Sequence, residues 1–338
     1  MAMAVLLALC GCGGDEFDIV GAFMRQPADA GSAAQAGEQA QAGAAASGER
    51  PPYGERTAVV VSTAADIYED ADNTSRRLTQ ILFDQPVSVL EPGAQWAKVE
   101  TLGGAQGWTR ARNVDGDWAC IDRRRYEARI VITSKNKQIY SHPRNGIVVR
   151  DVGMGTELFV ISKAESVYEV ALPGNMTGWL SENGTFQLDA AESIKKTTAE
   201  IFAQSCEKFR GTSYLQGGVS FQGIDGAGLL YAAMKINGVP LPHDLGGQML
   251  VGEGVGAGEA AVGDVFFFSA AGLGGDGNSD GGEARFGSAA GGAGLSDAGV
   301  YMGDGKFLHA SQHAGKVMYD DISDPYYQQR LYSVRRYF

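Results

Sequence analysis

The chain has 338 residues, of which 44% are hydrophobic, and its formal net charge at pH 7 is −12. This length allows two or three globular domains, each with its own core. The negative charge argues against a nucleic-acid partner, because such a partner requires a cationic surface to replace the counterions of the phosphates. We expect no cofactor, and we interpret the acidity as favouring solubility.

The chain begins with an apolar stretch that ends at Cys12. It is much shorter than the roughly 20 residues of a membrane-spanning helix, and its composition is typical of a signal peptide. Leu9-Cys10-Gly11-Cys12 resembles a bacterial lipobox, which implies that Cys12 is the lipidated residue. We therefore predict a signal peptide at 1–12 and an exported protein. A lipid anchor would hold it in the envelope, either in the periplasm or at the outer membrane or surface.

Small and polar residues dominate the next segment, and 29–50 has no large apolar side chain. Such a composition cannot bury a core, so it predicts a flexible tether, which we place at 13–55. A tether behind a lipid anchor suits a domain that must reach away from a membrane.

Short apolar and β-branched runs separated by turn-rich pieces fill 56–118. We predict strands at 58–61, 66–68, 86–90, 96–99 and 107–109. This pattern favours a small β-barrel.

A second, weaker copy of this pattern follows at 126–189. Ile139-Tyr140 matches Ile67-Tyr68, and Gly178-Trp179 matches Gly107-Trp108. A single repeat of this size indicates two similar modules and is too short for a solenoid. Both copies resemble bacterial SH3 (SH3b) domains, which commonly bind cell-wall peptides or shape a neighbouring active site.

The hydrophobic period then changes to that of a helix across 191–209, where apolar residues recur on one face. Cys206 lies on this apolar face, so we interpret it as a small core residue rather than a catalytic one. Cys120 and Cys206 are the two cysteines of the mature part. They are able to pair in an oxidising compartment, but the sequence leaves this open.

Five blocks follow one another in the remaining part of the chain, which we assign to a domain at 191–338. They are Phe209 to Gly218, Gln222 to Leu229 (QGIDGAGL), Val262 to Phe267 (VGDVFF), Asp297 to Gly305 (DAGVYMGDG) and Phe307 to Ser311 (FLHAS). In residues and in order they resemble the NlpC/P60 family. This resemblance implies an α+β, papain-like domain after the two SH3b modules. The whole arrangement is similar to γ-D-glutamyl-L-diamino-acid endopeptidases, which cut the stem peptides of peptidoglycan.

The resemblance implies a cysteine nucleophile at the start of a helix, a histidine base and a third polar residue that orients this histidine. At these positions the chain has Gly226, Asp297 and His309. Glycine has no side chain, so covalent catalysis from position 226 is excluded. An aspartate at 297 has no thiol to activate. Weak hydrolysis by Asp297, His309 and water remains an alternative.

Three further residues are candidates for ligand binding. Tyr214 and Asp225 keep the family residues, and Ala227 replaces the serine that follows the family cysteine. The family aspartate at position 225 helps to receive the free amine of the stem peptide, which a carboxylate can do without a nucleophile. The alternative is that Asp225 only caps the helix that follows it.

A glycine-rich insert covers 269–296, and Asp276 to Gly281 fits the first half of a calcium loop. Gly287 stands where the loop needs a bidentate glutamate, so we predict no metal site and interpret the insert as a flexible loop at the rim of the cleft.

These observations together predict a non-catalytic envelope lipoprotein that binds peptidoglycan stem peptides or an envelope protein. One alternative is an active cell-wall peptidase that uses non-standard residues. Another is a structural module that makes only protein contacts.

Overall fold

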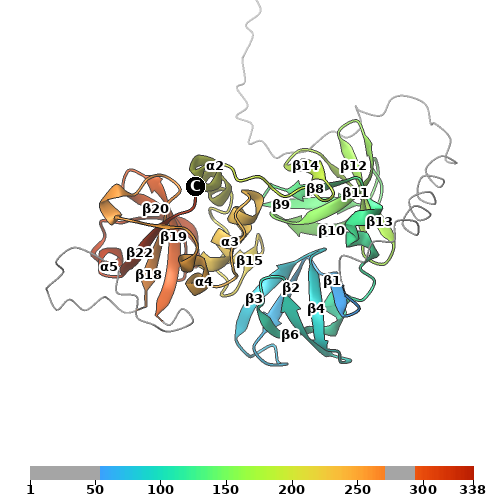
Figure 1. Ribbon diagram of the computed structural model, residues 1–338, viewed down its shortest axis with the longest axis horizontal. Coiled ribbons are helices and arrows are strands. Elements are labelled where there is room, and N and C mark those ends of the chain that lie inside the picture. Colours follow the sequence, from blue (N-terminus) through green and yellow to red (C-terminus); the bar gives the residue numbers. More distant parts are fainter. Residues whose placement is uncertain (1–53, 271–293) are drawn as a thin grey trace, which may run out of the picture.

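The computed structural model describes residues 54–270 and 294–338 (Figure 1). The described part contains two curved β-sheets followed by a C-terminal domain in which helices cover a third sheet. The predicted signal peptide, Cys12, the tether up to residue 53 and the insert from 271 to 293 lie outside the described residues.

The first sheet has seven strands in the order β3-β2-β6-β5-β4-β1-β7. Alternate side chains of β5 point inward, so that Ala97, Val99 and Thr101 are buried while their neighbours are partly exposed. The strands are β1 (Thr57–Val60), β2 (Ala64–Tyr68), β3 (Arg77–Leu82), β4 (Pro86–Glu91), β5 (Trp96–Thr101), β6 (Gln106–Arg110) and β7 (Val114–Asp115).

The second sheet has the order β10-β9-β13-β12-β11-β8-β14, which is the order of the first sheet with every number raised by seven. Its strands are β8 (Ala128–Ile132), β9 (Asn136–Tyr140), β10 (Val148–Gly153), β11 (Glu157–Ala164), β12 (Val167–Leu172), β13 (Met176–Ser181) and β14 (Thr185–Asp189). A 3-10 turn at Ala111–Asn113 separates β6 from β7, and the segment between the two sheets contains two more, at Ala119–Ile121 and Arg123–Arg125.

The predicted internal repeat is confirmed down to single residue pairs. Tyr68 pairs with Trp108 in the first sheet, and Tyr140 pairs with Trp179 in the second. The glycine before each tryptophan is required by close packing. A Cβ at Gly107 would lie 2.6 Å from the carbonyl oxygen of Tyr68, so larger residues are excluded there.

The C-terminal domain, defined here as α2 to the C-terminus, contains a six-stranded sheet in the order β17-β22-β18-β19-β20-β21. Its elements are α2 (Ala199–Glu207), β15 (Val219–Ser220), β16 (Gly223–Ile224), α3 (Gly226–Ile236), α4 (Leu245–Leu250), β17 (Glu253–Val255), a 3-10 turn (Ala257–Glu259), β18 (Val265–Ser269), β19 (Leu295–Gly303), β20 (Lys306–Ser311), β21 (Lys316–Asp321), α5 (Pro325–Gln328) and β22 (Leu331–Arg336). This mixed α/β architecture is the α+β class predicted for 191–338.

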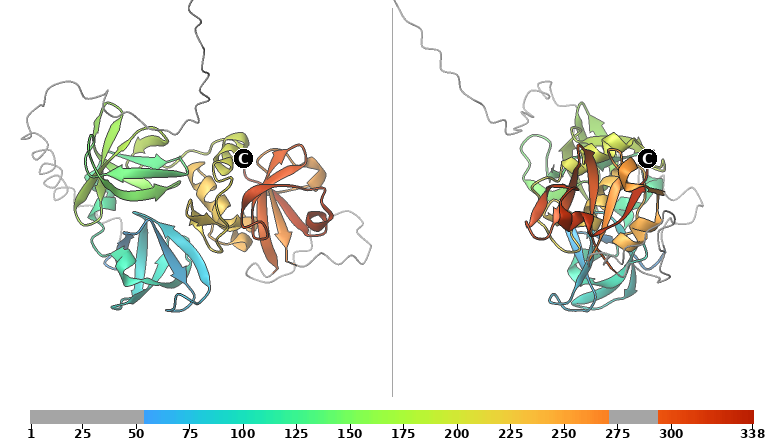
Figure 2. Two further views of the ribbon diagram at one scale, coloured as in Figure 1. Left: turned by 180° about the vertical axis from the view of Figure 1, so that it is seen from behind. Right: turned by 90° about the vertical axis from the view of Figure 1, so that its left-hand side faces the viewer.

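Strand β18 is buried on both faces, which explains its uninterrupted apolar sequence. Val265 and Phe267 face the main core with α2 and α3. Phe266 and Phe268 pack with Phe307 in a second cluster. The helices α2, α3 and α4 therefore lie between the C-terminal sheet and the two N-terminal sheets (Figure 2).

The helix predicted over 191–209 is shorter than expected. It begins at Ala199, because Thr198 has extended backbone and its hydroxyl accepts a hydrogen bond from the amide of Ile201. Phe202 and Cys206 are buried as predicted. Cys206 and Cys120 are both free thiols. They belong to different core clusters.

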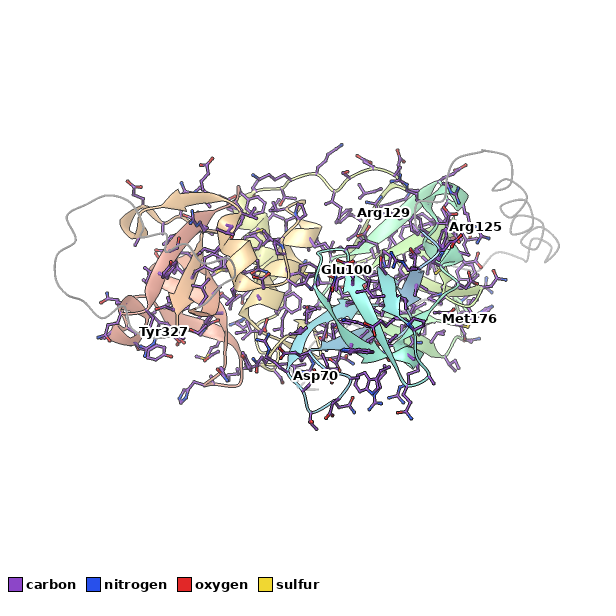
Figure 3. The ribbon with its side chains drawn as sticks, turned by 60° about the horizontal axis from the view of Figure 1, so that its bottom comes forward. Asp70, Glu100, Arg125, Arg129, Met176 and Tyr327 are labelled. Atoms are coloured by element: carbon purple, nitrogen blue, oxygen red, sulfur yellow. The ribbon has the colours of Figure 1, made fainter. Side chains whose placement is uncertain are left out.

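Two interfaces connect the C-terminal domain to the sheets. Val131 and Met154 of the second sheet region belong to the same core cluster as α2 and α3. At its edge, Glu157 forms ion pairs with Arg129 of the second sheet and Lys235 of α3 (Arg129 is labelled in Figure 3). The first sheet contacts the C-terminal domain through β3, where the amide of Val219 donates to the Gln80 side chain.

Among residues 54–270 and 294–338, no helix is long and apolar enough to cross a membrane.

Candidate active site

A cleft of about 1560 Å³ lies between the C-terminal domain and the first sheet. The C-terminal domain contributes the start of α3, the start of β19, the end of β20 and α5. The first sheet contributes two segments, 76–79 at the start of β3 and 103–106 before β6. The six predicted site residues of this domain all line the cleft. They are Tyr214, Asp225, Gly226, Ala227, Asp297 and His309.

Asp225 is the N-cap residue of α3. One carboxylate oxygen accepts the amide of Gly228 at 2.8 Å, and the other accepts the amide of Gly217 at 2.6 Å. Burial raises the pKa of this carboxyl, although these two backbone donors oppose the rise. The helix-capping role left open by the sequence is therefore present, and it fixes the turn that carries position 226.

Gly226 is the first residue of α3 and is buried against β19. A Cβ at this position would lie 2.7 Å from Oδ1 of Asp297 and 3.1 Å from the backbone nitrogen and oxygen of Ala298. The Asp297 carboxylate thus occupies the space that a side chain at 226 would need. It is fixed there by the amide of Ala298, which donates to the same oxygen at 2.8 Å.

Asp297 and His309 lie on the neighbouring strands β19 and β20, as their spacing of twelve predicted. Oδ2 of Asp297 is 2.5 Å from Nδ1 of His309. The other ring nitrogen, Nε2, is 2.9 Å from Oδ2 of Asp320, which also accepts the Tyr327 hydroxyl at 2.5 Å. The result is a continuous chain of hydrogen bonds from Asp297 to Tyr327, which is labelled in Figure 3.

The position of His309 between two carboxylates determines its charge. Burial alone would lower the pKa of the imidazole, but the hydrogen bonds and charges of Asp297 and Asp320 outweigh this effect and raise it. Burial likewise raises the pKa of Asp297, against the hydrogen bond from His309. The two carboxylates therefore stabilise the protonated imidazole of His309 relative to the neutral one.

We expect Asp320→Asn to lower the pKa of His309, because it removes one of the two carboxylates that stabilise the imidazolium. The stabilisation that His309 gives is fully present below its unfolded-state pKa of about 6.5 and is lost as the pH rises through the higher folded-state value. In the variant this loss is complete at lower pH, because only the folded-state pKa has fallen. Titration of the His309 ring by NMR measures both values, and an unchanged pKa would contradict the assigned contact.

The remaining predicted residues form the floor and wall of the cleft. Burial raises the pKa of Tyr214 to about 12, so its hydroxyl stays protonated. Ala227 has no polar side chain, and its carbonyl accepts the Gln248 side-chain amide at 2.9 Å. No group of three or more metal-ligating side chains occurs within 54–270 and 294–338. The partial calcium loop at 276–281 lies outside these residues.

His243 is a cleft residue that the sequence analysis missed. Its Nδ1 is 2.7 Å from the hydroxyl of Thr79 on the first sheet, and its ring packs 3.9 Å from that of Tyr231. Burial lowers its pKa to about 4, so it is neutral near pH 7. His243 precedes α4 and belongs to no motif in the sequence. Only its contact with Thr79 of β3 reveals that it lines the cleft.

Comparison with known proteins finds a family match in the same part of the chain that contains the cleft residues. The NlpC/P60 family matches residues 211–279 and 285–336. The C-terminal domain is therefore an NlpC/P60 domain.

The homology extends beyond this domain. Over 274 residues the chain is 25% identical to a γ-D-glutamyl-L-lysine dipeptidyl-peptidase of Bacillus cereus, covering 78% of this chain and 76% of the relative. The namesake enzyme of Bacillus subtilis is 26% identical over 77% of this chain and 81% of its own. The crystal structure of an NlpC/P60 family protein from Bacillus cereus superposes with a TM-score of 0.71 at 21% identity, covering 83% of this chain and 99% of that one. The likeness to this structure shows a shared fold.

Proposed function

We propose that this protein is a non-catalytic NlpC/P60 protein of the cell envelope that binds peptidoglycan stem peptides in the cleft. The observation that carries the proposal is Gly226, which stands at the first turn of α3 where the family resemblance places the nucleophile. Two relatives, aligned over 78% and 77% of this chain, are named for the γ-D-glutamyl-L-lysine bond. We transfer the ligand class, a γ-D-glutamyl peptide, and not the activity.

The geometry around Gly226 supports a loss of catalytic activity rather than a catalytic site rebuilt from other residues. The carboxylate of Asp297 faces the empty position, and it repels a thiolate instead of stabilising one. His309 is engaged on both ring nitrogens by Asp297 and Asp320. With both ring nitrogens engaged by carboxylates, His309 has no free nitrogen with which to accept a proton from a nucleophile.

The same geometry supports binding of a cation. Asp225 and Asp297 both present carboxylate oxygens at the cleft floor, and each oxygen has lone pairs beyond those used by backbone amides. The protonated amine of a peptide is a suitable ligand for such a pair. We assign Tyr214 and Ala227 to the apolar surface beside this position.

Asp225→Asn tests this binding site. The variant keeps an acceptor for the helix cap but loses the charge, so we expect affinity for a peptide with a free amine to fall about tenfold or more. Isothermal titration with an L-alanyl-γ-D-glutamyl-L-lysine peptide measures the change. Asp122→Asn is the matched control, since Asp122 also caps a short helical turn, at Arg123–Arg125, and does not line the cleft. No measurable binding by the natural chain would refute the ligand assignment.

The surroundings of the domain complete the proposal. We propose that the two sheets, at 56–118 and 126–189, are SH3b modules, which their shared strand order and paired tyrosine and tryptophan support. We further propose export, with a lipid anchor at Cys12 and a tether at 13–55. Labelling of the expressed protein with a radioactive fatty acid, compared with Cys12→Ala, tests the anchor.

A further inference from the structure

We propose a second binding site, on the first sheet and separate from the cleft, that takes a carboxylate group of an acidic peptide. The site is a groove of about 710 Å³, here called the arginine groove. Its wall and rim are formed by Ala64, Asp66, Tyr68, Asn73, Ala94, Gln95, Arg110, Arg112 and Asn113. This proposal does not depend on whether the cleft binds a ligand.

The guanidinium of Arg110 is fixed in place before any ligand arrives. It lies 4.0 Å from the ring centroid of Trp96, and its Nε donates to the side-chain oxygen of Asn73 at 3.2 Å. Tyr68 supports Trp96 from the side, with an edge-to-face contact between ring centroids 5.9 Å apart. Such stacking holds a planar guanidinium in one orientation and so reduces the entropy lost on binding.

The two arginines retain free hydrogen-bond donors. Within the described part of the chain, neither the Nη atoms of Arg110 nor any side-chain nitrogen of Arg112 has a hydrogen-bond partner. The one acidic residue that lines the groove, Asp66, is already paired with Arg77 at 2.7 Å and accepts the Gln80 amide at 2.9 Å. The groove thus offers an excess of cationic donors in an acidic protein, and a carboxylate is the group that pairs with a guanidinium fork.

The internal repeat shows that the fold does not require this arrangement. In the first sheet, Trp96 pairs with Arg110 across β5 and β6. The same register position in the second sheet is occupied by Val167 and Ser181. Both sheets have the same strand order. The stacked pair is therefore an addition to the first copy, and a ligand explains why a surface carries it.

The arginine groove is adjacent to the cleft. Asp66 of β2 lines the groove, whereas its ion-pair partner Arg77 of β3 lines the cleft and donates to the carbonyl of Gln216 in the C-terminal domain. One ion pair thus separates the two sites. An extended peptide able to occupy the cleft has a route to place a carboxylate in the groove.

The test uses the full chain and a γ-D-glutamyl-L-lysine peptide acetylated on both its α-amine and its lysine ε-amine, so that no ammonium group remains to bind the carboxylates of the cleft. The chain has four tryptophans, so the indole N–H signal of Trp96 in a nitrogen-15 spectrum reports the groove directly. We expect this signal to shift on titration. The same peptide with its carboxyl groups amidated should bind at least about tenfold more weakly, since a charge-assisted hydrogen bond is lost.

Two variants test the two arginines. The first gives position 110 the serine that the second sheet has at the equivalent position, and the second removes the charge of Arg112. Arg110→Ser and Arg112→Gln should each weaken binding about tenfold, and thermal melting should show that both fold. Lys98→Gln is the control, because Lys98 lies on β5 outside the groove and is paired with Glu91; it should keep the affinity. A Trp96 signal that does not move, or equal affinity for the acid and the amide, overturns the proposal. Triglutamate replaces the peptide in a second arm, and its binding would show that any acidic peptide suffices.

Discussion

The variant that combines Gly226→Cys with Asp297→His is expected to cleave γ-D-glutamyl-L-lysine bonds, whereas the natural chain leaves them intact. A cysteine at the first position of α3 lies at the positive end of the helix dipole, which favours its thiolate. A histidine at 297 is adjacent to it and keeps the imidazole of His309 as its neighbour. Mass spectrometry of stem peptides incubated with each protein measures the products.

The single change Gly226→Cys should remain at least roughly 100-fold less active than the double variant, the usual contribution of a general base. In the single variant, the new Cβ would lie 2.7 Å from the Asp297 carboxylate, which disfavours the thiolate. Gly226→Ala with Asp297→His is the packing control and should be inactive. Cleavage by the natural chain at a rate comparable to that of the double variant would disprove the non-catalytic assignment.

Asp84→Asn is expected to stabilise the protein strongly at pH 9 and hardly at all at pH 4. Asp84 lies in the turn between β3 and β4 of the first sheet, and only 4% of its surface is exposed. One of its oxygens accepts the thiol of Cys120 at 3.2 Å, while the other, buried, has no partner. Burial raises the pKa of this carboxyl to about 8.

The direction of this pH dependence follows from the pKa of Asp84 in the unfolded and in the folded chain. The unfolded chain releases the Asp84 proton near pH 4, whereas the folded chain keeps it until about pH 8. The contribution of Asp84 to the free energy of unfolding is therefore largest below pH 4. It falls between pH 4 and 8, by an amount on the order of several kcal/mol. Asparagine removes this loss, and it tolerates the left-handed backbone at this position, where φ is 63°.

Chemical denaturation of both proteins from pH 4 to pH 9 measures this difference. Asp117→Asn, at an exposed position in the segment that carries Cys120, serves as the control for a simple change in net charge. Parallel pH profiles for the natural chain and Asp84→Asn would show that Asp84 ionises normally.

The sequence predicted the parts of the fold that repeat a local pattern. Gly107-Trp108 and Gly178-Trp179 identified the repeat because both glycines meet the same packing requirement. The blocks around Asp225, Asp297 and His309 located the cleft, because the register of β19 and β20 fixes their proximity. Strand β3 was not predicted, since Thr79 and Gln80 interrupt its apolar pattern. They are buried because they contact Asp66, Val219 and His243 of other elements.

The resemblance to SH3b domains allowed for a contribution of the first sheet to the active site, but it did not indicate which residues make it. Arg77 and Gln216 are hydrogen-bonded although 139 residues separate them, and Arg77 belongs to no motif. The network beyond His309 was likewise hidden, because Asp320 and Tyr327 come together only through the turn between β21 and α5. Local periodicity reports burial, but it does not report which distant surface provides it.

The core shared by Val131, Met154 and the helices α2 and α3 has an evolutionary consequence. Because the second sheet supplies part of the core of the C-terminal domain, neither can drift freely without exposing apolar surface of the other. The chemical step depends on a single side chain, whereas the cleft walls are tied to the stability of the entire chain. In the non-catalytic protein that we propose, glycine at 226 removes the nucleophile in one event, whereas the shape of the cleft is retained because the folded chain depends on it.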